Sequence, residues 1–133
     1  MKLLIVDDDP KNLKLLKAMV ADLGECEAVE CGEKAISAFK KAWENWRPFN
    51  LIFLDILMPE IDGKQVLSQI RKIETDKKIS DQHRVKIIMV TASSEKEIVF
   101  DCLRKGCDDF IVKPVDGQLL INKIKQLGLM NLN

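Results

Sequence analysis

The sequence predicts an α/β fold in which a five-stranded parallel sheet is covered by helices on both faces. Five short apolar runs alternate along the chain with segments of helical periodicity. Most of these runs are continuously apolar, which is typical of strands buried on both faces of a parallel sheet. The 133-residue chain has the length of one domain, and no apolar run is long enough for a membrane span.

Each strand is predicted from a short run rich in apolar residues. The second run differs from the others because its apolar residues alternate with polar ones. The third is almost entirely apolar and ends in an aspartate, Asp55. In chain order, the strands are expected at residues 2–6, 26–31, 51–55, 85–91 and 109–112.

Each helix is predicted from apolar side chains that recur every three or four residues. Asp9 before Pro10 is typical of an N-cap and a first helical residue, and Ser94 is a second N-cap candidate. The residues expected to end the first, second and fourth helices are Gly24, Pro48 and Gly106. The apolar positions are Leu13, Leu16, Val20 and Leu23; Ile36, Phe39, Trp43 and Trp46; Val66, Leu67, Ile70 and Ile73; Ile98, Val99, Cys102 and Leu103; and Leu119, Leu120, Ile124 and Leu127.

Other conspicuous residues are expected to be structural. Asp62 and Gly63 have the residue types of a turn, and residues 74–84, which contain His83, read as a long polar surface connection. Trp43 and Trp46 are expected to pack on the core. The four cysteines lack a CxxC spacing and are expected to be small apolar residues in a reducing compartment; they are Cys26, Cys31, Cys102 and Cys107.

The charge balance argues against bulk attraction to nucleic acid or to an anionic membrane. Lys+Arg and Asp+Glu both number 21, so the formal net charge is zero. The N-terminal apolar stretch is short and runs into three aspartates, unlike a signal peptide. We therefore expect a cytoplasmic protein with no direct nucleic-acid partner and no membrane insertion.

Polar side chains follow four of the five predicted strands at their carboxyl ends. Ligands of open parallel sheets bind at that edge, so we expect these side chains to meet there. Three carboxylates against one lysine leave a formal charge of −2, and two carboxylates about 4 Å apart repel by roughly 4 kcal/mol at an effective dielectric near 20. The residues are Asp7, Asp8, Asp55, Thr91 and Lys113.

A divalent cation would offset this repulsion. Carboxylate, carbonyl and water oxygens suit Mg²⁺, or Mn²⁺, rather than zinc. With the cation bound, the set could accept an anion, with a hydrogen bond from Thr91 and a point charge from Lys113. A carboxylate oxygen of Asp55 could then attack an activated phosphoryl group and form an acyl phosphate.

Four motifs in one order and spacing carry a resemblance to a known family. They are LLIVDDDP, LIFLDILMPEIDG, IIMVTA and DDFIVKP. Together they resemble the receiver domains of response regulators, of the chemotaxis-regulator type, over about residues 2–127. The resemblance implies a single receiver domain over residues 1–133, with a flavodoxin-like, doubly wound sheet in strand order 2-1-3-4-5 and five helices.

Position by position, the resemblance implies that Asp55 is the phosphoacceptor. Mg²⁺ would be held by the side chains of Asp8 and Asp55 and by the backbone carbonyl of Leu57, with Asp7 acting mainly through a bound water. Lys113 would be the phosphate-binding lysine, in a cis peptide bond to the proline that follows it.

The resemblance also implies a conformational switch made of Thr91 and Phe110. Many members have tyrosine where this chain has Phe110, which can rotate but has no hydroxyl. Leu57 and Ser93 occupy positions that tune hydrolysis of the acyl phosphate in this family. Because apolar Leu57 gives little help in positioning a water, we expect a slowly decaying phosphoryl group.

The function implied is that of a phosphorylation-driven switch rather than an enzyme, although the domain would assist its own phosphotransfer and dephosphorylation. A sensor histidine kinase or a phosphotransfer protein would donate the phosphoryl group. A downstream protein target would then bind the surface formed by the fourth helix, fifth strand and fifth helix. The chain is expected to be a stand-alone receiver or one cut from a longer protein, and Met1 directly before the first strand favours a natural start.

Two other functions fit parts of the pattern. One is a Mg²⁺-dependent phosphohydrolase of the haloacid-dehalogenase type, but its nucleophile lies on the first strand in a DxDx[T/V] pattern, where this chain has Lys11. The chain also has no segment for a cap domain. The other is a receiver that binds its partner without phosphorylation, against which the intact set of five polar residues argues.

Overall fold

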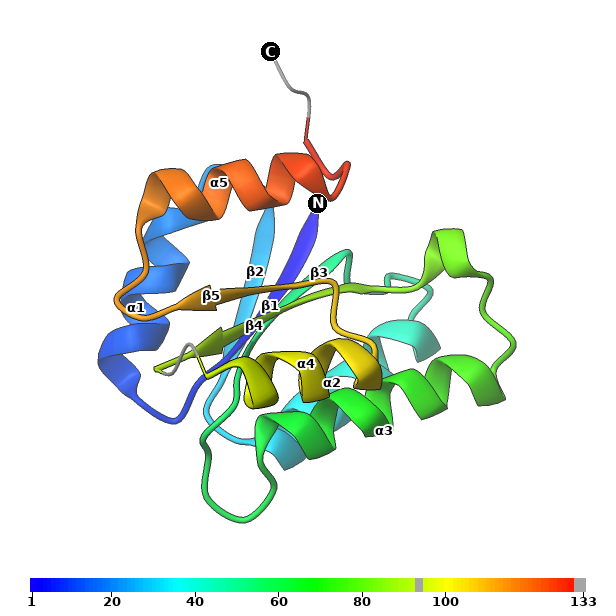
Figure 1. The fold of residues 1–133 in the computed structure, drawn as a ribbon. Helices are drawn as coiled ribbons and strands as arrows, with labels where there is room; N and C mark the ends of the chain where they lie inside the picture. The colour runs from blue at the N-terminus through cyan, green and yellow to red at the C-terminus, as the bar shows by residue number, and fades with distance from the viewer. Residues whose placement is uncertain (93–94, 131–133) are drawn as a thin grey trace.

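The computed structural model describes residues 1–92 and 95–130, and this part of the chain alternates strands and helices around one parallel sheet (Figure 1). The order in the sheet is β2-β1-β3-β4-β5, which confirms the predicted fold. The strands are β1 (Lys2–Val6), β2 (Glu25–Val29), β3 (Leu51–Asp55), β4 (Lys86–Thr91) and β5 (Asp109–Val112). The helices are α1 (Pro10–Met19), α2 (Gly32–Glu44), α3 (Gly63–Asp76), α4 (Lys96–Lys105) and α5 (Gly117–Gln126), with a 3₁₀ turn at Asp81–His83.

Helices cover the sheet on both faces, with α1 and α5 on one side and α2, α3 and α4 on the other (Figure 1). Each layer buries an apolar stripe against the strands. All five residues of β3 are buried, because this strand lies at the centre of the sheet with neighbours on both edges and both faces. None of the described helices is both long and apolar enough to cross a membrane.

The parallel register brings the carboxyl ends of the central strands to one edge. Val6 pairs with Leu54, and Asp55 pairs with Val90. Thr91 in turn pairs with Val112, so the residues at the carboxyl ends of β1, β3, β4 and β5 lie at one edge of the sheet.

The first helix ends earlier than the sequence pattern predicts. Its last residue is Met19, and Val20 is the C-cap, so the prediction that Gly24 ends it is wrong. Gly24 has φ +155°, and a Cβ there would lie 1.9 Å from the carbonyl oxygen of Met1. The missing side chain of Gly24 therefore lets the start of β2 pack against the N-terminus, where Glu25 N donates to Met1 O at 3.0 Å.

The second helix is also shorter, and one of its expected core residues is on the surface. The helix ends at Glu44, and Trp46 lies beyond it with φ +57° and 85% of its area exposed. The left-handed backbone takes Trp46 off the apolar face that the helical spacing predicts. Trp43, inside the helix, packs against the core as expected.

The Asp62–Gly63 pair starts a helix and is not a separate turn. The Asp62 carboxylate accepts from Gln65 N at 2.9 Å, and the Gln65 side chain accepts from Asp62 N at 2.9 Å. This reciprocal pair is a capping box. Asp9 caps α1 as predicted, whereas the proposed cap Ser94 lies outside the described residues.

The polar segment 74–84 is not a surface connection throughout. The third helix continues to Asp76, and Glu74 is fully buried, where its carboxylate accepts from Val85 N at 2.8 Å and from Arg71 at 2.6 Å. His83 is exposed, as expected. The cysteines are free; Cys102 and Cys107 are buried, and the other two are half-buried.

Candidate functional site

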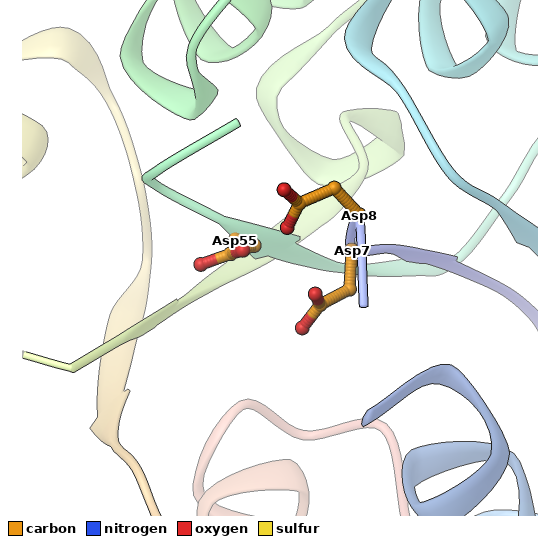
Figure 2. Close-up of side chains that lie close together, drawn as sticks. All are labelled: Asp7, Asp8 and Asp55. Atoms are coloured by element: carbon orange, nitrogen blue, oxygen red, sulfur yellow. The ribbon is translucent and has the colours of Figure 1, made fainter. Parts of the chain in front are cut away.

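Three carboxylates gather at the carboxyl edge of the sheet (Figure 2). Asp7 and Asp8 directly follow β1, and Asp55 is the last residue of the neighbouring strand β3. One oxygen from each lies within 4.8 Å of the other two. Asp7 and Asp55 are buried, and Asp8 is exposed, so the cluster is reached from solvent on one side.

Local hydrogen bonds fix the backbone that presents these carboxylates. Asp7 N donates to Val29 O at 3.2 Å, and the Asp7 carboxylate accepts from Asp9 N at 2.9 Å. Asp9 itself turns its carboxylate to the start of α1, where it accepts from Lys11 N. The structure therefore separates Asp9, which caps a helix, from the two aspartates beside it.

Lys113, which follows β5, brings its ammonium group to the cluster. Its Nζ lies 3.2 Å from Asp7 Oδ2 and 3.4 Å from Asp55 Oδ1. Lys113 N donates to Thr91 O at 2.7 Å, which ties the lysine backbone to the end of β4. The peptide bond to Pro114 is cis, as the resemblance implies.

The other sequence-predicted residues lie on or just after the strands β3, β4 and β5. Thr91 is the buried last residue of β4 and adjoins the strand that carries Asp55. Leu57 follows Asp55 by two residues and leaves 72% of its area exposed. Phe110 is half-buried on the edge strand β5 and packs against the core on the side of α2, α3 and α4.

Burial and like charge together disfavour ionisation of Asp55. Desolvation, followed by the nearby Asp7 carboxylate, raises the pKa of Asp55 from 3.8 to about 6, although Lys113 opposes the shift. Burial acts to lower the pKa of Lys113, but the carboxylates of Asp55 and Asp7 outweigh it and raise the pKa above its ordinary value. One lysine thus leaves the negative charge of the cluster only partly compensated.

The cluster has the donor chemistry of a hard-cation site. Asp7 Oδ2 is buried and receives no hydrogen bond from any described residue, although Lys113 Nζ lies 3.2 Å away. That single ammonium is shared with Asp55 Oδ1, 3.4 Å away, so it neutralises only part of the negative charge of the cluster. Three carboxylates that converge without a histidine or cysteine fit Mg²⁺ or Mn²⁺ better than zinc.

Gly63 is a site residue that the sequence pattern did not reveal. A Cβ on this residue would lie 2.1 Å from the carbonyl oxygen of Asp55, and Gly63 N donates to Ile56 O at 2.8 Å. The start of α3 therefore packs directly on the backbone of Asp55. The Asp–Gly pair was visible in the sequence, but it indicated a turn and gave no sign of what the glycine touches.

The chain is similar to known proteins over nearly all of its length. The family model for the response regulator receiver domain matches residues 3–125. The chain is 38% identical over 128 residues to hybrid signal transduction histidine kinase L of Dictyostelium discoideum. That match covers 96% of this chain but 7% of the kinase, so the chain spans only a small part of that relative's length.

Two solved structures show the same fold. A chain of the CheX–CheY–BeF₃–Mg²⁺ complex from Borrelia burgdorferi has TM-score 0.80 and 30% identity, with 96% of this chain and 89% of that chain covered. A chain of the complex between the Saccharomyces cerevisiae phosphotransfer protein Ypd1 and the receiver domain of Ssk1 has TM-score 0.84 and 28% identity. The coverage there is 98% of this chain and 90% of that chain.

Proposed function

The chain belongs to the response regulator receiver domain family of two-component signalling, and on that premise we propose that it takes up a phosphoryl group on Asp55. Receiver domains are phosphoacceptors rather than classical enzymes. The reaction proposed here is transfer from a phosphohistidine: a carboxylate oxygen of Asp55 forms a bond to phosphorus as the bond from phosphorus to the histidine nitrogen breaks. The product is an aspartyl phosphate, and the histidine is released.

The observation that carries this proposal is the position of Lys113 between two buried carboxylates, 3.2 Å from Asp7 and 3.4 Å from Asp55. A half-buried cation at this place can stabilise negative charge on the Asp55 carboxylate and on an added phosphoryl oxygen. It can do so without a large reorganisation, because its backbone is held by Thr91 O. At pH 7 a carboxyl with a pKa of about 6 is mostly ionised, as a nucleophile must be.

We propose that Mg²⁺ binds at the same cluster, with Mn²⁺ as a substitute. Asp8 and Asp55 would be ligands through their side chains, Leu57 through its backbone carbonyl and Asp7 mainly through a bound water. When bound, the cation supplies positive charge that draws together the nucleophile and the anionic donor. The convergence of the three carboxylates, which share a single ammonium, supports this assignment, as does the Mg²⁺ in the similar Borrelia complex.

The phosphorylated state is proposed to differ from the resting state at Thr91 and Phe110. Thr91 would donate a hydrogen bond to a phosphoryl oxygen, and the Phe110 ring would move toward the space that the threonine leaves. This movement would change the surface of α4, β5 and α5, which a downstream protein reads. The donor proposed is a sensor histidine kinase or a phosphotransfer protein, and the Ypd1–Ssk1 complex is a precedent for the latter.

Intact-mass analysis after incubation with acetyl phosphate tests the chemistry. The wild-type protein is expected to gain the mass of one phosphoryl group in the presence of Mg²⁺ and little in EDTA. Asp55→Asn should gain none, whereas the matched control Asp76→Asn, at an exposed aspartate of α3, should behave as wild type. Equal labelling of Asp55→Asn and wild type would overturn the assignment.

A further inference from the structure

Lys123 of α5 makes two contacts with β5, the edge strand of the sheet. Its Nζ lies 2.9 Å from Asp109 Oδ1 and 5.5 Å from the centroid of the Phe110 ring. The side chains of Lys123 and Asp109 are only 19% and 20% exposed, so this pair is better shielded than an ordinary surface ion pair. An ammonium within about 6 Å of a ring centroid attracts the ring.

The Phe110 ring and the Thr91 side chain lie on the same face of the sheet. Phe110 pairs in register with Met89, and both pack with the core on the side of α2, α3 and α4. Thr91 is two residues past Met89 on the same strand, so its side chain points to that face as well. The ring therefore lies between two possible neighbours, the Lys123 ammonium at the strand edge and the threonine toward the site.

We propose that Lys123 is a positioning residue for Phe110. Asp109 anchors the lysine ammonium, and the ammonium holds the aromatic ring at the outer edge of β5 in the resting protein. When the ring moves toward Thr91, it loses its contact with the ammonium. The ion pair with Asp109 still holds the Lys123 side chain against β5. The contacts of Lys123 thus couple the orientation of the Phe110 ring to α5. This inference rests on the proposed function, because the inward movement of the ring carries a signal only when Asp55 is phosphorylated.

The expected size of the effect follows from the strength of the contact. A cation–π contact of this exposure contributes about 0.5–1 kcal/mol, which corresponds to a roughly two- to fivefold change in the ratio of outward to inward rings. That change would bias the switch without fixing it in one state. A phenylalanine needs such an external contact more than a tyrosine does, because it has no hydroxyl to hold it in place.

NMR of the unphosphorylated, metal-free protein tests the proposal. The readouts are the NOE between the Phe110 ring and the Thr91 methyl group and the ring-current shift of that methyl. Lys123→Gln should strengthen the NOE and move the methyl resonance upfield, in line with a two- to fivefold larger inward population. Lys123→Arg keeps a cation over the ring and should restore the wild-type values.

Lys125→Gln is the matched control, because Lys125 is on the same helix and forms no ion pair with a described residue. The proposal is overturned if Lys123→Gln matches wild type or Lys125→Gln, or if Lys123→Arg does not restore the NOE. Should Lys123→Gln fail to fold, Asp109→Asn replaces it. This variant keeps the lysine but removes its anchor, and unchanged signals would equally overturn the proposal.

A titration with beryllofluoride and Mg²⁺ separates this inference from the proposed function. Lys123→Gln should reach the inward state at about two- to fivefold lower beryllofluoride concentration than wild type. If wild type shows no response to beryllofluoride, the proposed phosphoacceptor function fails. The comparison in the resting protein stands or falls independently of that result.

Discussion

The start of α3 packs so closely on the phosphoacceptor candidate that Gly63 leaves no room for a side chain: a Cβ there would lie 2.1 Å from the carbonyl oxygen of Asp55. Gly63→Ala must therefore displace backbone, and we expect it to destabilise the protein by about 1–3 kcal/mol and to slow labelling of Asp55 by acetyl phosphate. Urea unfolding and intact-mass kinetics measure the two effects.

Gly117→Ala is the matched control for this substitution. Gly117 is also the first residue of a helix, but a Cβ there meets no atom within 4 Å. We expect this variant to be neutral or slightly stabilising, since alanine lowers the conformational entropy of the unfolded chain. Equal stability of the two variants would contradict the packing argument.

Asp55→Asn should stabilise the metal-free protein at neutral pH. The pKa of Asp55 is raised to about 6 in the folded state, so its ionisation opposes folding by about 1–3 kcal/mol above that pH. This penalty falls as the pH drops from about 6 toward the unfolded pKa of 3.8, below which the carboxyl is protonated in both states, so the gain from asparagine should be smaller at pH 4.5 than at pH 7.5. Urea unfolding in EDTA at pH 7.5 and 4.5 measures this difference; a less stable Asp55→Asn protein at pH 7.5 would contradict it.

Mg²⁺ should raise the unfolding temperature of the wild-type protein. A ligand that binds only the folded state stabilises it by about 1–3 kcal/mol at ten to a hundred times its Kd. Asp8→Asn should lose most of this gain without a loss of basal stability, because Asp8 is exposed. Asp22→Asn, at an exposed aspartate outside the cluster, should keep the full gain. An equal Mg²⁺ response of both variants would remove Asp8 from the proposed ligands.

Glu74→Ala should destabilise the protein by about 3 kcal/mol. The buried Glu74 carboxylate accepts from Val85 N and Arg71, and Arg71 also donates to Gly106 O and Asp108. The substitution therefore leaves Val85 N and one guanidinium N–H of Arg71 without their acceptor. Asp76→Ala, two residues on, removes only an exposed pair with Lys72 and should have little effect. Chemical denaturation of the two variants provides the comparison, and similar midpoints would show that burial of Glu74 contributes nothing.

The presence and type of every strand and helix could be predicted from the sequence, because burial of each element depends on its own residue pattern. Short apolar runs placed β1, β3 and β5 at the residues where the structure has them, and the Asp9–Pro10 pair placed the start of α1. The rule that parallel strands point their carboxyl ends to one edge also predicts that Asp7, Asp55 and Lys113 approach one another. Their chemical roles stay predictions.

Several element ends and the environments of some side chains could not be predicted in this way. Trp46 fits the apolar spacing of α2, but the left-handed backbone beyond the helix exposes it. Glu74 looks like one polar residue among many, and it is buried only because Arg71 and Val85 N satisfy its carboxylate. Such contacts depend on residues that are distant in the chain or on backbone conformations that the residue pattern does not specify.

The amino-acid sequence alone determined which segments form strands and helices and which polar groups leave the strands at the carboxyl edge, because both follow from local residue patterns and chain order. Only the tertiary structure decided that Lys113 lies between Asp7 and Asp55, that one buried oxygen of Asp7 receives no hydrogen bond from a described residue, and that Lys123 faces both Asp109 and Phe110. The physical reason is that distances, burial and electrostatic coupling arise when separate elements pack together.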